Sequence, residues 1–177
     1  MQPLETALRP LGRVIGTHGL RGDLKIKGHP GNQAALLAAP RIYLRQNDTG
    51  SDCLTVQRIV PGRGWLRVSL REIDRIERAE PLVGAEVLVD PASLQRDDGD
   101  LFWFELEGLD VIDTGRGPIG RLEEMFETGA HAVYVVRGRY GEVLIPAVPE
   151  FIGAVDLERG TLQVDVPEGL FPDNLGQ

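Results

Sequence analysis

Glycine and proline interrupt this chain so often that little room is left for long helices. The 177 residues include 22 glycines and 12 prolines, and in the second half a break comes about every 8–12 residues. The apolar residues between the breaks form short, evenly spaced runs. That pattern is typical of strands in β-barrels and not of alternating strand–helix units. The sequence therefore predicts an all-β fold with little helix.

The first half carries the elements of one such unit. Residues 11–27 predict two strands around a turn at 16–22, which holds three of the glycines and so allows a tight connection. Asn32 and Asp74 are expected to cap short helices, Asp74 together with Glu77 as a capping box. Further strands are expected at 42–44, 54–60, 65–70 and 86–89.

A polar, turn-rich segment separates this unit from the rest of the chain. It contains Pro91, Ser93 and an acidic run at 97–100, with little apolar material to bury. We therefore expect a first domain at 1–90, a linker at 91–100 and a second domain at 101–177. Strands of the second domain are expected at 101–106, 109–112, 119–126, 132–136, 143–145 and 161–166.

The two halves differ in charge. Residues 1–90 hold 13 Lys and Arg against 10 Asp and Glu, whereas residues 91–177 hold 6 against 17. A basic face attracts nucleic acid and an acidic face attracts basic proteins, so the asymmetry suggests two surfaces with different partners. Acidic surfaces also serve solubility alone, and the charge by itself leaves both interpretations open.

The composition excludes most enzyme chemistry. Cys53 is the one cysteine, so no disulfide forms within the chain, and His18, His29 and His131 are too scattered for a zinc site. The common nucleotide-binding, hydrolase and metalloprotease motifs are absent. We expect no metal, no cofactor and no catalytic residue. No signal peptide or membrane span is visible in the sequence, and we therefore expect a cytoplasmic protein.

The glycine-rich turn is the first candidate binding site. As a general base, His18 would need a nucleophile and an orienting carboxylate, and we favour a histidine that stabilises the turn or touches phosphate. Basic residues on and after the turn could meet RNA phosphates. The candidate RNA contacts are His18, Gly19, Arg21, Gly22, Lys25 and Lys27. The carboxylates Glu123, Glu124 and Glu127 are interpreted as a solvated face.

The aromatic run at 102–104 is the second candidate. In a strand, Phe102 and Phe104 would point to one side and Trp103 to the other, which would leave an aromatic side chain to anchor a partner. The same rings could instead be structural, with the strand packed between two domains. Both interpretations stay open.

Two long motifs and several short ones resemble a known family, the RimM ribosome maturation factors. The motifs are GRVIGTHGLRGDLKI at 12–26 and FWFELEGLDV at 102–111. Shorter matches occur in the family's order at 117–120, 128–130, 144–146, 155–158 and 167–170. The resemblance covers nearly the whole chain.

The resemblance implies two small β-barrels joined by a short linker. The first would be a six-stranded barrel like those of translation factors, and the second a PRC barrel. It also implies a monomeric, non-enzymatic chaperone that binds immature small (30S) ribosomal subunits, and not mature ribosomes, and assists rRNA processing and maturation of the head. Its protein partner there would be the nineteenth small-subunit ribosomal protein.

The resemblance places the ribosomal-protein-binding pair on Phe102 and Trp103, where the family usually has tyrosine, so the hydroxyl groups are missing. Glu105 stands where the family commonly has aspartate. Two alternatives from other classes remain: an enzyme that acts on RNA or nucleotides through the His18 turn, and a PRC-type adaptor that binds only proteins.

Overall fold

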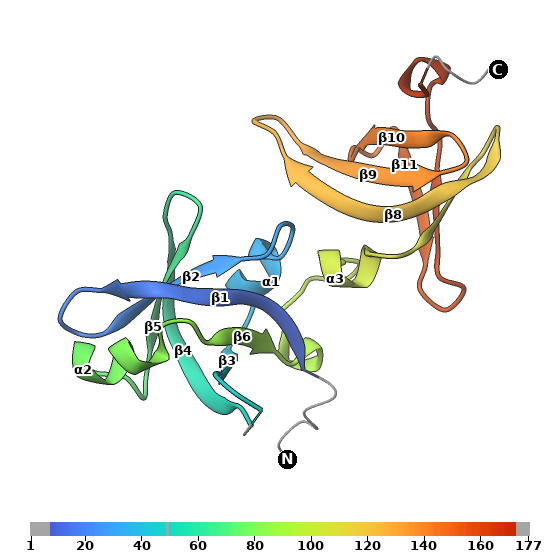
Figure 1. Cartoon of the computed structure of the whole chain (residues 1–177). Coiled ribbons are helices and arrows are strands. Elements are labelled where there is room, and N and C mark those ends of the chain that lie inside the picture. The colour runs from blue at the N-terminus through green and yellow to red at the C-terminus, as the bar shows by residue number, and fades with distance from the viewer. Residues whose placement is uncertain (1–7, 49, 173–177) are drawn as a thin grey trace. The chain divides into compact units, whose positions relative to one another are not determined.

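The computed structural model describes residues 8–48 and 50–172. The chain divides into two units, with the boundary between Asp100 and Leu101. In Figure 1 both units consist mainly of strands, with a few short helices. The predicted all-β class is therefore confirmed. Within the described ranges, no helix is long and apolar enough to cross a membrane.

The first unit is a closed six-stranded barrel, as the resemblance implied. Its strands follow one another around the barrel in the order β1-β2-β5-β4-β3-β6. The neighbours pair in antiparallel fashion throughout. The strands are β1 (Arg9–His18), β2 (Asp23–Gly28), β3 (Arg41–Arg45), β4 (Asp52–Pro61), β5 (Leu66–Leu70) and β6 (Glu86–Val89).

The alternation of side chains along these strands explains the barrel. Leu24 and Ile26 of β2 are buried, and Lys25 and Lys27 beside them are half-buried and exposed. On β5, the residues Leu66, Val68 and Leu70 are buried in the same alternating way. Successive side chains of a strand point to opposite faces. The apolar set therefore fills the barrel, and the polar set lies outside it.

Neither of the two predicted side-chain caps forms at a helix start in the structure. Helix α1 (Gln33–Leu37) does begin after Asn32, but the Asn32 side chain makes no capping bond and its buried Oδ1 has no partner in the structure. Helix α2 (Ile76–Ala79) begins after Arg75. Asp74 lies one residue too early to cap it, so the predicted capping box is wrong. The 3-10 turn η2 (Glu80–Leu82) continues from α2.

The segment predicted as a linker begins on the first unit. Its 3-10 turn η3 (Pro91–Ser93) is capped by the side chain of Asp90. Leu94 is buried, and the backbone N–H of Gln95 donates to the carbonyl of Ala38 at 3.0 Å. Residues up to Gln95 are thus attached to the first barrel.

The second unit is a six-stranded sheet in the order β10-β9-β8-β7-β12-β11. Strands β12 and β7 are parallel, and the other neighbours are antiparallel. The sequence did not predict β11. The elements are β7 (Asp110–Asp113), β8 (Gly117–Glu127), β9 (Ala132–Gly138), β10 (Gly141–Pro146), β11 (Ile152–Asp156), β12 (Thr161–Val164) and the 3-10 turn η4 (Glu168–Leu170).

The strand predicted at 101–106 is wrong, because this segment forms the helix α3 (Trp103–Leu106). The backbone N–H of Phe102 donates to Oε2 of Glu105 at 2.8 Å, which satisfies a donor that a helix start leaves free. The helix stops before Gly108, whose φ of 87° is left-handed. Phe102 and Trp103 consequently do not alternate across a strand.

Candidate functional site

The glycine-rich turn after β1 has the backbone that its sequence predicted. Gly19 has a φ of 75° and Gly22 a φ of 83°, in the left-handed region that favours glycine. The carbonyl of Leu20 accepts a hydrogen bond from the backbone N–H of Ile76 at 2.9 Å. A Cβ atom on Gly22 would lie 2.5 Å from the carbonyl oxygen of Arg75. The turn is therefore fixed against the start of α2, and Arg21 is exposed on it.

The strand register next to this turn gathers basic side chains. Lys25 on β2 pairs with Arg67 on β5, and Lys27 pairs with Arg13 on β1. All four alternate with buried neighbours and therefore lie on the outer side of the barrel. We call Arg13, Lys25, Lys27 and Arg67 the basic face.

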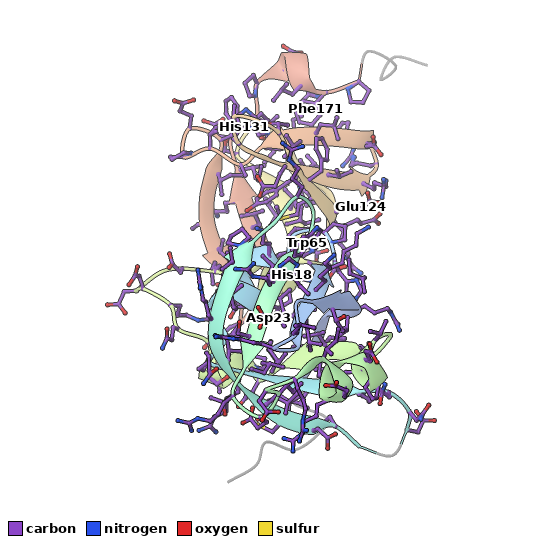
Figure 2. The ribbon with its side chains drawn as sticks, turned by 90° about the vertical axis from the view of Figure 1, so that its left-hand side faces the viewer. His18, Asp23, Trp65, Glu124, His131 and Phe171 are labelled. Atoms are coloured by element: carbon purple, nitrogen blue, oxygen red, sulfur yellow. The ribbon has the colours of Figure 1, made fainter. Side chains whose placement is uncertain are left out.

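Trp65 and His18 lie beside the basic face. The Nζ atom of Lys25 is 5.0 Å from the centroid of the Trp65 ring, and the ring centroids of His18 and Trp65 are 6.3 Å apart. Nη1 of Arg67 lies 3.3 Å from Nε2 of His18. Figure 2 shows the labelled His18 and Trp65 close together on the first unit. Both cations thus border an aromatic pair that could contact a nucleic acid.

The candidate RNA contacts predicted from the sequence did not include Trp65 or Arg67, which the structure adds to this site. Trp65 follows the glycines of the hairpin turn between β4 and β5, and only the pairing of β2 with β5 brings it to Lys25. A signal was available in the alternation of Arg67 with Leu66 and Val68, which places a basic side chain on the outer face of β5.

The surroundings of His18 do not fit a catalytic base. Arginine only donates hydrogen bonds, so Nε2 of His18 is the acceptor in its 3.3 Å contact with Arg67. The nearby carboxylate of Asp23 accepts from Oγ of Ser69 at 2.9 Å and lies 3.7 Å from Nε of Arg67. These contacts hold Asp23 to β5.

In the second unit, the predicted aromatic anchors are buried. Phe102 and Trp103 are each 7% exposed. The Trp103 ring packs in the core of the unit, 6.1 Å from the Tyr134 ring between centroids, and the Phe102 ring stacks on Phe104 at 5.9 Å. A direct role of this pair in binding a ribosomal protein remains a prediction.

The carboxylates interpreted as a solvated face do lie at the surface. Nη1 of Arg137 donates to Glu124 at 2.7 Å and to Glu123 at 3.0 Å, and Nη2 donates to Glu142 at 3.0 Å. These hydrogen bonds, with Glu124 contributing most, raise the pKa of Arg137. In the described part of the chain, no group of three or more histidine, cysteine or acidic side chains could hold a metal ion.

Comparisons with known proteins match both units. The family model for the RimM N-terminal domain matches residues 10–94, and that for the RimM PRC barrel domain matches residues 103–170. A ribosome maturation factor RimM from Syntrophotalea carbinolica is 40% identical over 167 residues, which are 90% of this chain and 92% of that protein. A second from Pelobacter propionicus is 33% identical over 165 residues, 93% of this chain and 95% of that protein.

A solved structure is similar as well. A crystal structure from Pseudomonas aeruginosa, described as a 16S ribosomal RNA processing protein RimM, is 29% identical. The match covers 92% of this chain and 99% of that chain, with a TM-score of 0.47.

Proposed function

Because this chain belongs to the RimM family of ribosome maturation factors, we propose that it assists maturation of the small ribosomal subunit in the cytoplasm. The family is one of assembly factors and not of enzymes. The chain acts through binding energy: it holds a segment of the subunit head, including 16S rRNA, in a productive arrangement and then leaves. No covalent step is needed.

The basic face of the first barrel is the observation that carries this proposal. Lys25 and Arg67 are paired across β2 and β5, with His18 and Trp65 beside them. Lysine and arginine contacts to phosphates supply affinity without reading sequence. A partly exposed indole adds a surface on which an unpaired base can stack. We assign rRNA contact to this face, together with Arg21 on the neighbouring turn.

The second unit takes the protein partner in this proposal. Residues 91–177 hold 17 acidic against 6 basic residues, and such a surface attracts a basic ribosomal protein by long-range attraction. The family resemblance points to the nineteenth small-subunit protein of the head. Since Phe102 and Trp103 are buried, we assign them the task of holding α3 in place for this contact.

Sucrose-gradient fractionation of a cell extract tests the proposal. The chain should co-migrate with immature small-subunit particles and be absent from joined ribosomes. The double variant Lys25→Ala/Arg67→Ala should move toward the top of the gradient. Arg41→Ala is the matched control, because Arg41 is exposed on β3 of the same barrel, away from β2 and β5.

Each result of this fractionation has a clear meaning. Equal amounts of the chain on mature and immature particles would contradict a maturation role. If the double variant co-migrates like the parent, the basic face does not contact rRNA, and an adaptor that binds only protein becomes the better description.

A further inference from the structure

The second unit is acidic overall, but it carries one local cluster of positive charge at the turn between β9 and β10. Residues 101–177 contain five arginines and no lysine. Arg121, Arg137 and Arg159 each pair with carboxylates within 3.8 Å. The other two, Arg116 and Arg139, lie beside the ring of Tyr140. We call Arg116, Arg139 and Tyr140 the Tyr140 cluster.

Two guanidinium groups border one aromatic ring in the Tyr140 cluster. Cζ of Arg139 lies 5.2 Å from the centroid of the Tyr140 ring, and Cζ of Arg116 lies 5.5 Å from the same centroid. An aromatic face attracts a cation at such a distance, so each contact restricts the positions that the arginine side chain takes. Because both groups border one ring, they are close enough together to meet neighbouring phosphates of one nucleic-acid strand.

The hairpin that carries Arg139 and Tyr140 is closely packed at its base. Gly138 on β9 pairs with Gly141 on β10, so the turn consists of Arg139 and Tyr140 alone. A Cβ atom on Gly138 would lie 2.4 Å from Cα of Gly120 on β8. The backbone of β8 thus approaches the hairpin more closely than a side chain would allow. The turn therefore presents Arg139 from a fixed backbone.

Arg139 is the member of the Tyr140 cluster that is available to a partner. It is exposed, and among residues 8–48 and 50–172 it pairs with no carboxylate. Arg116 is already engaged: its Cζ lies 4.0 Å from the centroid of the Phe171 ring, and its Nη2 lies 3.6 Å from Oε1 of Glu168. The side chain of Glu168 is 93% exposed, so water screens this ion pair. Two guanidinium groups against one carboxylate leave the cluster positive.

We propose that the Tyr140 cluster is a second rRNA contact, through which the otherwise acidic second unit binds the phosphate backbone. A guanidinium group matches the geometry of a phosphate and binds it through two parallel hydrogen bonds. This inference rests on the proposed function, which brings the chain to 16S rRNA, and it adds an RNA contact to a unit that was assigned only a protein partner. Phosphate contacts position a protein without reading sequence, so the cluster fixes where the second unit lies on the RNA.

RNA binding across a salt series tests this inference. The full-length chain is titrated into a fluorescently labelled transcript of the head domain of 16S rRNA. Arg139→Ala should weaken binding about tenfold at low salt, because a charge-assisted contact is lost. The slope of log affinity against log salt concentration should become shallower by about 0.7–0.9. Arg139→Lys should keep the slope of the parent but bind more weakly, because lysine has no planar fork of donors.

Two further variants control for charge and for folding. Arg159→Ala is the matched control: the Arg159 side chain is 84% exposed in the same unit and pairs with Asp156, and this variant should bind like the parent. Arg139→Gln removes the charge but keeps most of the stem over the Tyr140 ring, so it should reproduce the slope change even if Arg139→Ala is less stable. Thermal unfolding of each variant identifies a binding defect that comes from misfolding.

The outcomes distinguish this inference from the proposed function. If the parent binds the transcript and both Arg139→Ala and Arg139→Gln bind it equally well at every salt concentration, the second contact is wrong and the proposed function stands. If these variants bind immature particles more weakly but the protein-free transcript normally, the cluster contacts an acidic protein and the rRNA assignment is wrong. If the parent does not bind the transcript, the inference falls, and the gradient experiment still decides the maturation role independently.

Discussion

The ammonium group of Lys25 lies 5.0 Å from the centre of the Trp65 ring, although 40 positions of sequence separate the two residues. The pairing of β2 with β5 brings them together. A cation at this distance from an indole gains about 0.5–1 kcal/mol at an exposed site. The contact holds Lys25 at a defined place beside Arg67, so the positive charge of the basic face is localised before any partner arrives.

Removing one cation of this face should change how RNA binding depends on salt. For Lys25→Ala, the slope of log affinity against log salt concentration should become shallower by about 0.7–0.9, because one fewer counterion is released. Arg41→Ala should leave the slope unchanged. Immature-particle binding measured across a salt series checks this. Parallel slopes for Lys25→Ala and the parent would place the phosphate contacts elsewhere on the barrel.

Alanine at the two glycines of the turn should have unequal effects on stability. Both have positive φ values, which cost about 1–2 kcal/mol with a side chain. At Gly22 the new Cβ would also lie 2.5 Å from the Arg75 carbonyl, whereas at Gly19 it meets nothing within 4 Å. Crowding should add about 1–3 kcal/mol at Gly22. Urea unfolding of Gly19→Ala and Gly22→Ala measures the difference. Equal losses of unfolding free energy would contradict close packing of the turn against Arg75.

Truncating Trp103 should destabilise the second unit. Its ring is 7% exposed and packs within the core, and large-to-small changes of buried aromatics cost about 3–5 kcal/mol. Differential scanning calorimetry should show a lower melting temperature for Trp103→Ala than for Leu157→Ala, which truncates an exposed side chain. An unchanged melting temperature would mean that Trp103 does not support the core.

Replacing Asp113 should also destabilise this unit. It is 4% exposed, and its carboxylate accepts hydrogen bonds from the backbone N–H groups of Gly115, Arg116 and Val166 at 2.9–3.0 Å. In Asp113→Ala these donors lose their acceptor, at a cost of about 2–4 kcal/mol. Chemical denaturation can compare it with Asp165→Ala, an exposed site that binds only Oγ1 of Thr114 among the described contacts. Equal losses of unfolding free energy in Asp113→Ala and Asp165→Ala would contradict the stabilising role of the Asp113 carboxylate.

The free energy of unfolding should fall in alkaline solution because the pKa of Tyr43 is raised in the folded chain. Burial first, and then its hydrogen bond and charge interaction with Cys53, raise the pKa of Tyr43 to about 12, against an ordinary value of 10.0. Above about pH 10 the unfolded chain loses the phenol proton while the folded chain keeps it. The resulting contribution to stability is complete below pH 10 and is lost progressively up to about pH 12.

The variant Tyr43→Phe isolates this contribution. The difference in unfolding free energy between the parent and Tyr43→Phe should shrink between pH 9 and pH 12, as urea unfolding at stepped pH would measure. Cys53→Ala should lower the pKa of Tyr43, because Cys53 is one cause of its rise. If the difference in unfolding free energy between the parent and Tyr43→Phe does not depend on pH, the pKa of Tyr43 is not raised.

The limits of the sequence analysis can be seen at α3 and β11. Aromatic residues favour strands, and the run at 102–104 was therefore assigned to one. The competing signals were Glu105, three residues after Phe102, and Gly108 just past the helix end, which together mark a short capped helix. Strand β11 was missed because Gly153 breaks its apolar pattern. Strand β12 follows after a four-residue turn, and Asp156 pairs with Thr161 across this hairpin.

The outward direction of the basic side chains on β2 was predictable because the alternation of this strand is strong. Lys25 and Lys27 stand between Leu24, Ile26 and the glycines around them, so their outward direction could be read from the sequence. Which strand lies beside β2 could not, because β5 is about 40 residues away and follows two other strands in the chain. The neighbourhood of Lys25, Arg67 and Trp65 therefore needed the three-dimensional structure.

The parallel pairing of β12 with β7 also fixes the order in which the two units can fold during synthesis. The barrel of the first unit can close once Val89 has been made, because β6 is its last strand. In the second unit, β7 keeps one unpaired edge until Thr161–Val164 emerges, and Val166 and Phe171 complete the core still later. During synthesis the first unit can thus fold while the second still lacks its last paired strand. A premature stop before Thr161 would spare the first barrel and leave the second half unable to fold.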